Sequence, residues 1–515
     1  MARDFKDIDD PCVGYARNLT KWTLPRDLSE GAQAMREGQD PINGAWWLPQ
    51  FSAEEPEDFH ERRRTATLHG LFSSGVDRLA SQPFGKSVQI SEMDRLDKRL
   101  IESADGSDGY LDDIDGDGTS LTDFARRCYE DATTYGITHA LTRHTAQDES
   151  DTGGRPIIEH VPALSLIGWI YDDAGTLIDC RISGTIVERD PENPWQEVEY
   201  QTTRRYYLTD AGVMSEFYVH DDENKKQKQR GKAQEMRGDP VLLTDEAGSP
   251  LAEIPLFTLY FRRTGQMEAD PPLMALAEAN LAHYRALSDY DSAVHGAAVP
   301  MLAMTGIEES SQDPGEATMQ TEEKVSVHRV VKTKAEGAKF YWVEISGAAC
   351  EAARTRVKDI EERAETLGGQ PKTRAGAGTA TAVWVDERSS EGKVSSWNRA
   401  VEAFLTLCLW SMGDWMGSPM PRECIVNIPE DRPLTQGRLE EVHAILAIYN
   451  AGDLLPKKDA LTALASVVPS LEKIDVDEAI EIAQSEPRRA GTGDLGEEFG
   501  AGVPLDEEEE DDVGE

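Results

Sequence analysis

The sequence has few cysteines and no long apolar run, and each absence argues against a class of protein. Its six cysteines are scattered, without a CxxC pair or a histidine at metal-ligand spacing, so neither a disulfide framework nor a cysteine-based zinc site is supported. No stretch approaches the ~20 consecutive apolar residues of a membrane helix. The charged start, MARDFKDIDDPC, lacks the apolar core of a secretion signal. We therefore expect a soluble protein, made in a cytoplasm, with no membrane partner.

Basic residues are also scarce. The 53 Lys and Arg residues are outnumbered by 96 Asp and Glu residues, which gives a formal net charge of −43. This balance argues against a protein that coats nucleic acid by neutralising its phosphates. The segment 486–515 alone holds twelve acidic and two basic residues, which predicts a disordered acidic tail. Assembly of many copies would need large apolar or paired interfaces to overcome the repulsion between them.

Motifs for catalysis are missing as well. The sequence contains no GxSxG nucleophile turn, no HExxH zinc motif and no GxxxxGK[ST] phosphate loop. Its ten histidines are dispersed, and acidic residues are so abundant that no carboxylate pair stands out. We expect no enzyme activity, no catalytic residue and no cofactor. An acidic hydrolase is a rival that would require a pocket of carboxylates with shifted pKa values.

One motif that is present resembles a calcium loop. In DIDGDGTSLTDF, the residues Asp113, Asp115 and Asp117 occupy the first, third and fifth positions of such a loop, and Gly118 follows them. The last position requires a bidentate Glu but holds Phe124, which fits the apolar face of the next helix. The motif therefore predicts an acidic turn that caps a helix. A calcium-regulated binding protein is the rival interpretation.

Hydrophobic periodicity divides the chain into regions. Residues 1–50 are predicted to be irregular, and helical spacing follows over 54–80 and 120–135. Over 155–262 the period changes to two, which predicts antiparallel strands joined by turns that end in Gly175, Gly212 and Gly248. The second half is mainly helical, with long helices predicted at 272–296, 347–367 and 389–416, short β-like stretches over 299–345, and short helices over 435–485.

Two stretches carry a resemblance to the portal proteins of tailed bacteriophages, and the similarity extends over about residues 40–485. One is ADPPLMALAEANLAHYRALSDYDSAVHGAAVPMLAMTG (269–306). It is similar to a helix of one portal subfamily with an N-L-A-H-Y-R-x-x-S-D-Y core, here Asn280 to Tyr290. The other is GAWWLPQFSAEEPEDFHERRRTATLHGLFSSGVDRLASQPFGK (44–86), in which an x-LP motif precedes a helix.

This resemblance implies an α+β fold of the portal type, with a wing, a helical stem, a small β-containing clip and a helical crown. The implied parts are an N-terminal arm (1–43), the wing (44–271, with the antiparallel β region 155–262), a stem helix (272–298), the clip (299–345), a second stem helix (346–367), a tunnel loop (368–382), a helix returning to the wing with its connection (383–432), the crown (433–485) and the acidic tail (486–515).

The resemblance also implies a role and partners. A homo-oligomeric ring of about twelve subunits would stand at the portal vertex of a virion capsid, and double-stranded DNA would be packaged and ejected through it. The implied partners are the terminase large subunit, the head–tail adaptor, and the major capsid and scaffold proteins. The main alternative is another virion structural protein, such as an adaptor or a minor capsid protein. Adaptors are usually much shorter and lack the helix–clip–helix order.

Residues that would face DNA fall in the implied tunnel loop. Its sequence, QPKTRAGAGTATA, is small, flexible and basic. Contacts there would go to the phosphate backbone and carry no sequence readout. The candidate residues are Lys372, Arg374, Gly376 and Gly378.

Overall fold

The computed structural model divides the chain into two compact units, Met1–Asp431 and Arg432–Glu515. The described residues are 8–52, 54–102, 109–144, 154–189, 193, 195, 197–220, 234–236, 239–298, 301–305, 339–343, 347–368, 380–429, 442–443, 445–449 and 457–467. In the second unit they form helix α11 (Lys457–Val467) and short helical stretches at 442–443 and 445–449. The predicted acidic tail lies outside the described residues, and the candidate site belongs to the first unit.

The prediction of an irregular segment over residues 1–50 is wrong, because two helices open the first unit: α1 (Val13–Glu30) and α2 (Ala32–Glu37). Helix α1 has no apolar stripe, contains Pro25, and buries several polar side chains. One of them, Asn18, donates from Nδ2 to the carbonyl of Met267 at 2.8 Å. Partners so far along the chain leave no local pattern in the sequence.

The helical spacing over 54–80 corresponds to two helices, α3 (Pro56–Thr65) and α4 (Leu71–Ser81). Pro56 stands in the first turn of α3, where its missing N–H costs nothing. Helix α4 carries the apolar stripe, whose buried members include Phe72, Val76 and Leu79. Short elements follow it: η1 (Gln82–Phe84), β1 (Gln89–Ile90), η2 (Met93–Arg95) and α5 (Lys98–Ile101).

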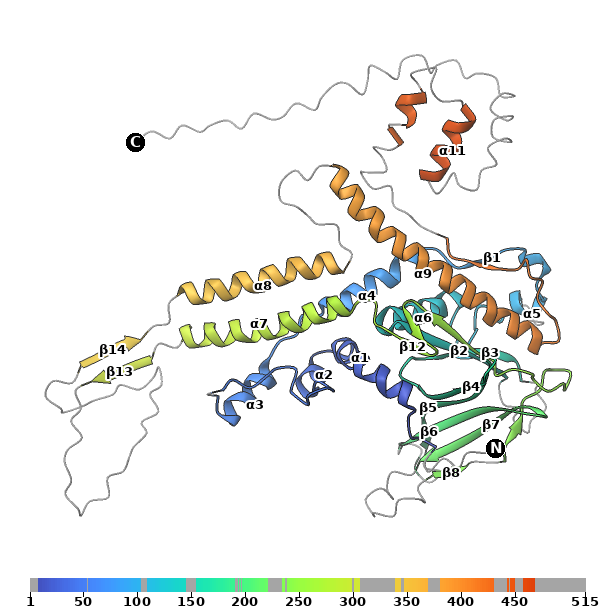
Figure 1. The fold of residues 1–515 in the computed structure, drawn as a ribbon, viewed down its shortest axis with the longest axis horizontal. Coiled ribbons are helices and arrows are strands. Elements are labelled where there is room, and N and C mark those ends of the chain that lie inside the picture. The colour runs from blue at the N-terminus through green and yellow to red at the C-terminus, as the bar shows by residue number, and fades with distance from the viewer. Residues whose placement is uncertain are drawn as a thin grey trace. The chain divides into compact units, whose positions relative to one another are not determined.

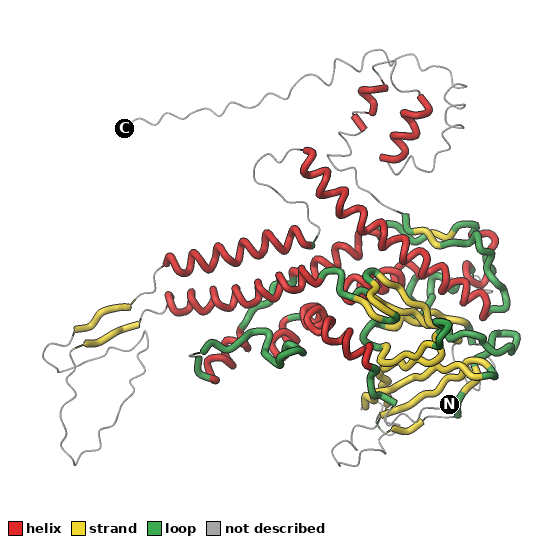
Figure 2. The backbone as a smooth tube through the Cα atoms, in the orientation of Figure 1, coloured by secondary structure: helices red, strands yellow, loops and turns green. Residues whose placement is uncertain are grey.

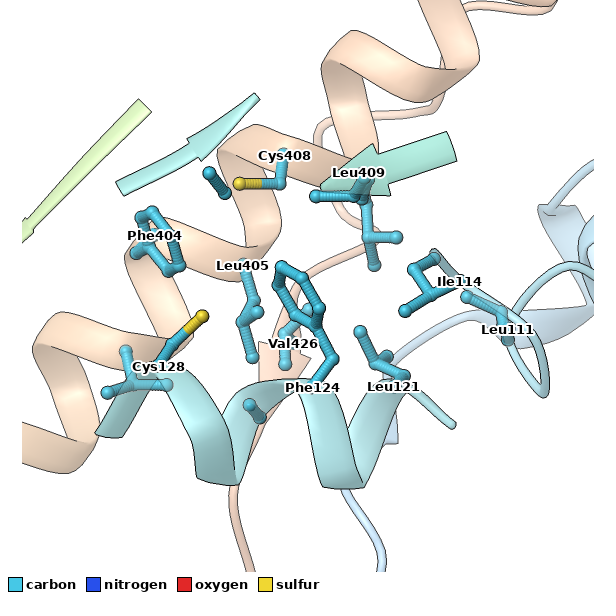
Figure 3. Close-up of a cluster of buried hydrophobic side chains, with 14 of the residues drawn as sticks. Leu111, Ile114, Leu121, Phe124, Cys128, Phe404, Leu405, Cys408, Leu409 and Val426 are labelled. Atoms are coloured by element: carbon cyan, nitrogen blue, oxygen red, sulfur yellow. The ribbon is translucent and has the colours of Figure 1, made fainter. Parts of the chain in front are cut away.

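Helix α6 (Leu121–Tyr135) forms where the sequence predicts a helix. Ser120 caps its start, because the Ser120 Oγ accepts from the Asp123 N–H at 3.1 Å and donates to the Asp123 carboxylate at 2.7 Å. Gly136 ends the helix in the left-handed conformation, with φ +86°. The apolar face of α6 packs against the long helix α9 (Ala380–Trp415) in a buried cluster (Figure 3) that includes Phe124, Cys128, Phe404, Leu405 and Cys408.

A three-stranded antiparallel sheet covers the same cluster, in the order β10 (Leu256–Tyr260), β2 (Ile137–His144), β3 (Pro156–Val161). The sequence prediction begins the β region at 155 and misses β2. Strand β2 is buried on both faces: Ala140 joins the cluster between α6 and α9, and Leu141 joins the core of a second sheet. A strand covered on both sides lacks the polar alternation that identifies a half-exposed one.

The second sheet has six strands: β4 (Leu166–Tyr171), β5 (Leu177–Arg189), β6 (Glu197–Thr209), β7 (Gly212–His220), β8 (Gln234–Met236) and β9 (Val241–Leu242), which pairs with β7. The predicted glycine turns join β4 to β5 and β6 to β7, and the third lies inside the bridge between Thr244 and Pro250. Gly175, Gly212 and Gly248 have φ values of +86°, +126° and +82°. This is the backbone region that favours glycine.

Three long helices account for most of the rest of the first unit, as predicted: α7 (Met274–Ala298), α8 (Gly347–Leu367) and α9. Helix α7 begins slightly later than predicted, since the Met274 N–H bonds the Pro271 carbonyl at 3.3 Å in a preceding turn. Small antiparallel pairs complete the described strands: β11 (Arg263–Gly265) with β12 (Glu268–Ala269), β13 (Met301–Thr305) with β14 (Lys339–Val343), and β1 with β15 (Val426–Asn427).

Helices and antiparallel sheets together build the first unit (Figure 2), which confirms a mixed α+β fold. Among the described residues, no helix combines the length and the apolar character needed to cross a lipid bilayer.

Candidate functional site

A helical hairpin made of α7 and α8 stands out in the first unit (Figure 1). The two helices pack side by side, and the chain that connects their far ends includes the antiparallel pair β13–β14. Met301 pairs with Val343, and Thr305 pairs with Lys339. Most of the remaining predicted clip, residues 306–338, lies outside the described residues. We call α7, α8 and these two strands the α7–α8 hairpin.

The first half of α7 is held in a buried cluster. Its side chains Leu276, Ala277 and Tyr284 lie there with residues of α1, α2, α4 and the segment between α2 and α3. These residues include Leu28, Met35, Trp47, Leu48, Phe72 and Leu79. Gly75 on α4 makes the approach close, because a Cβ at this position would lie only 2.6 Å from Leu276 Cδ2. The base of the α7–α8 hairpin is therefore fixed by the N-terminal helices.

Buried hydrogen bonds fix the same base. The Asn280 side chain is 1% exposed; its Oδ1 accepts from the Phe72 N–H, and its Nδ2 donates to the His69 carbonyl, both at 2.9 Å. One turn further on, Arg285 Nε donates to the carbonyl of Trp47 at 2.7 Å. The two stretches that carry the family resemblance therefore pack directly on each other.

Helix α8 is covered on one face only. Val357 and Ala364 are buried, whereas most other side chains of α8 are exposed. The exposed charged side chains have both signs, and they are Glu351, Arg354, Arg356, Lys358, Asp359, Glu362, Arg363 and Glu365. In a chain with a net charge of −43, this local balance lets α8 approach another acidic surface without strong repulsion.

The far part of α7 carries two carboxyl groups whose charge is disfavoured. Burial raises the pKa of Asp289 and of Asp291 above the ordinary aspartate value. The positive charge of Arg356 on α8 opposes this rise at Asp289. A further basic group brought to this part of α7 would stabilise both carboxylates.

One polar cluster joins α8 to α7 and to the segment before α4. His283 Nε2 lies 3.0 Å from Glu361 Oε1, and His69 Nδ1 lies 3.9 Å from the same oxygen. The sequence analysis misses this cluster, because the three residues come from three distant segments and share no motif.

The predicted tunnel loop joins α8 to α9. Its candidate DNA-facing residues lie outside the described residues, so they stay predictions: Lys372, Arg374, Gly376 and Gly378. Helix α9 begins at Ala380, which is inside the predicted loop and earlier than the predicted helix start at 389. On the α8 side, Arg78 of α4 donates a hydrogen bond to the Gly368 carbonyl and fixes the first residue of the predicted loop.

Helix α9 packs against the body of the first unit through the apolar stripe that its sequence predicts. Trp397 stacks on Phe261, with ring centroids 4.8 Å apart and planes 2° from parallel, and Tyr129 meets the same indole edge-on at 6.2 Å. The other members of the stripe are buried or half-buried: Val394, Val401, Phe404, Cys408 and Trp415.

In the calcium-like loop, the aspartates bond to the loop's own backbone and to arginines. Asp113 accepts from a backbone N–H of the loop at 2.7 Å and pairs with Arg155. Asp115 accepts from two loop N–H groups at 3.0 and 3.2 Å, and its other oxygen lies 3.4 Å from Arg127 Nη1. Burial opposes the charge of Asp115, but its hydrogen bonds lower its pKa overall. Within the described part of the chain, these aspartates do not form a group whose ligand atoms lie together.

Calcium is expected to leave the thermal unfolding temperature of the protein unchanged, because the two inner carboxylates already have partners. Asp113→Ala is expected to lower the free energy of unfolding by about 1–2 kcal/mol, equally with and without calcium. Asp117→Ala is the matched control: Asp117 is exposed, so its replacement should cost less than about 0.5 kcal/mol. A calcium-dependent rise in unfolding temperature that Asp113→Ala abolishes would favour the calcium interpretation.

Comparison with known proteins gives one family match and several similar structures. A family model described as "Domain of unknown function (DUF4055)" matches residues 272–416, which span α7, α8 and α9. No curated protein matches the chain.

Three of the similar solved structures are described as "Neck of empty GTA particle computed with C6 symmetry", "Virion of native gene transfer agent (GTA) particle" and "Neck of native GTA particle computed with C12 symmetry". Each is 13% identical to this chain, with TM-scores of 0.35, 0.36 and 0.35. The matches cover 80%, 86% and 80% of this chain and 94%, 98% and 94% of the other chains. Similarity at this level leaves the role of this chain to be inferred from its own residues.

Proposed function

We propose that this chain is the subunit of a phage portal ring, which forms the DNA channel at one vertex of a virion capsid. The observation that supports this most is the α7–α8 hairpin, with a β pair at its far end and the long helix α9 after it. The family resemblance implies this order for stem, clip, stem and return helix. The two stretches that carry the resemblance also pack on each other through Asn280 and Arg285.

The exposed surface of the hairpin suits assembly into a ring. Most side chains of helix α8 are exposed to solvent, and its first turns expose the small residues Ala348 and Ala352. Small residues let helices of neighbouring subunits approach closely. In a closed ring every subunit contacts its two neighbours through the same pair of surfaces. The exposed face of each α8 would therefore be covered by the next subunit. The mixed charges of α8 reduce the repulsion that a chain of net charge −43 would otherwise meet.

Such a ring would guide double-stranded DNA by its shape and phosphate backbone. Lys372 and Arg374 of the predicted tunnel loop would supply transient contacts, and Gly376 and Gly378 would face the channel beside them. The clip would meet the terminase large subunit during packaging and the head–tail adaptor afterwards. The major capsid and scaffold proteins would surround the ring in the virion.

No catalytic chemistry is proposed for this chain, and the energy for DNA movement would come from a separate ATPase. Several of the buried and half-buried acids of the described residues form ion pairs with arginines, as Asp179 does with Arg205 at 2.6 Å. Burial raises the pKa of the Cys128 and Cys408 thiols well above their usual range, which suppresses the reactive thiolate.

Mass photometry and negative-stain imaging of the purified full chain test this proposal. We expect rings of about twelve subunits with a central hole. Ala352→Glu should prevent ring formation while leaving the unfolding temperature of the chain unchanged, since Ala352 is exposed in the single chain.

Ala275→Glu is the matched control, because Ala275 is an exposed alanine in the first turn of α7, where an acidic residue suits the helix dipole. It should leave rings intact. A closed dimer or tetramer without a channel would contradict the proposal. A monomer would call for the same measurement on the chain co-expressed with a scaffold protein.

A further inference from the structure

Three potential metal ligands meet at the base of the α7–α8 hairpin. His69 lies in the turn before α4, His283 lies on α7, and Glu361 lies on α8. Each offers one ligand atom, and these atoms all lie within 4.8 Å of one another. Among the described residues, this is the one group of three or more His, Cys, Asp or Glu side chains that meets such a criterion.

The distances between the ligand atoms suit a small divalent cation. Ligand atoms bound to one tetrahedral zinc ion lie about 3.3 Å apart, given bonds of about 2.0–2.1 Å. His283 Nε2 and Glu361 Oε1 are 3.0 Å apart, and His69 Nδ1 is 3.9 Å from the same carboxylate oxygen. The two imidazole rings lie with their centroids 5.0 Å apart and their planes 36° from parallel. Small side-chain rotations would bring all three atoms to one ion.

Burial gives the cluster an inner wall and an open side. The His283 side chain is 0% exposed, whereas the side chains of His69 and Glu361 are 49% and 37% exposed. An ion could therefore enter from solvent past His69 and Glu361 and rest against His283. The open side leaves a fourth position for water, as in zinc sites with three protein ligands.

A hydrogen bond fixes the main chain of His69 relative to α7, the helix that carries His283. Asn280 lies one turn before His283 on α7, and its Nδ2 holds the carbonyl of His69 at 2.9 Å. This bond fixes the backbone of His69 relative to α7 without using its ring. Ligands held in place by other hydrogen bonds lose less freedom when they bind an ion.

One ring nitrogen of the cluster lacks a hydrogen-bond partner within the described part of the chain. His283 Nδ1 is buried and has no hydrogen-bond partner among the described residues. Because a metal-bound imidazole normally donates its other N–H to an acceptor, we expect this site to bind its ion more weakly, by about 10–100-fold, than a zinc site whose histidines all have such acceptors.

We propose that His69, His283 and Glu361 form a binding site for a divalent transition-metal ion of the zinc class. Two imidazoles and a carboxylate are ligands that zinc, cobalt and nickel accept. The ion would link α8 to α7 and to the turn before α4, and so stabilise the base of the α7–α8 hairpin. This inference does not depend on the portal role, since the site lies within one chain.

Metal binding to the full chain tests the proposal directly. The protein is first stripped with a chelator and then titrated with Co²⁺, whose visible absorption reports nitrogen and oxygen ligands, and with Zn²⁺, whose content is measured by mass spectrometry. We expect one equivalent per chain and a rise in the unfolding temperature on adding Zn²⁺. Glu361→Gln keeps a hydrogen-bond acceptor for His283 but replaces the charged ligand. It should weaken binding by more than about 100-fold, the upper end of what even outer partners of a metal ligand contribute.

Two further variants separate loss of the site from loss of the fold. His69→Ala removes a half-exposed ligand and should also abolish binding, while the unfolding temperature in chelator stays at the wild-type value. His295→Ala, an exposed histidine on the same helix, should bind one equivalent as the wild type does. The proposal is overturned if the wild-type chain takes up no stoichiometric ion, or if Glu361→Gln and His69→Ala both bind as the wild type does.

Discussion

Gly136→Ala is expected to lower the free energy of unfolding by about 3 kcal/mol or more. Gly136 ends α6 with φ +86°, where an alanine already costs about 1 kcal/mol. The added Cβ would also clash with the carbonyl oxygen of Asp270, just before α7. That oxygen belongs to the backbone and cannot rotate away, so either α6 or the start of α7 must shift. Urea unfolding followed by circular dichroism measures the loss.

Gly175→Ala is the matched control for this prediction. Gly175 has the same φ of +86°, but a Cβ there would meet nothing within 4 Å. Its replacement should therefore lower the free energy of unfolding by only about 1 kcal/mol, because an alanine is strained at this positive φ. Equal losses for the two variants would mean that the contact between Gly136 and Asp270 does not fix the start of α7.

Phe124→Ala is expected to lower the free energy of unfolding by about 3–5 kcal/mol. The Phe124 ring is 0% exposed and lies between α6 and α9, beside Phe404 and Leu405 (Figure 3). Its edge also meets the His160 ring at a centroid distance of 6.3 Å. Removal of the ring leaves a cavity in the cluster that joins α9 to the body, and the rigid surroundings can fill it only in part. Thermal unfolding of the full chain measures the effect.

Two substitutions at the same position make the Phe124 prediction specific. Phe124→Leu keeps most of the volume and should cost less than about 1.5 kcal/mol. Phe124→Glu would complete the calcium motif in the sequence, yet it should destabilise more than alanine does, because it buries a charge. Rescue of Phe124→Glu by calcium would contradict the assignment of this residue to the core.

The long helices could be predicted from the sequence because each has an apolar stripe at helical spacing. Val394, Val401, Phe404 and Cys408 identify α9 in this way, and they are half-buried or buried in the structure. The hairpins β4–β5 and β6–β7 were also predictable, since their turns need glycine at positive φ and their strands alternate. Local chemistry is sufficient in both cases.

Elements whose stability comes from distant partners could not be predicted in this way. Helix α1 buries polar side chains such as Asn18 against residues some 250 positions away, so it shows no apolar stripe. Strand β2 is covered on both faces, so its sequence does not alternate.

The sequence by itself determined the composition, the absence of enzyme motifs, the order of helices and strands in the second half of the first unit, and the resemblance on which the proposed role depends. Only the tertiary structure decided how those parts are used. It bonded Asp113 and Asp115 to their own loop, and it brought His69, His283 and Glu361 together. The physical reason is that periodicity reports which face of an element is buried, whereas a site depends on which distant element covers that face.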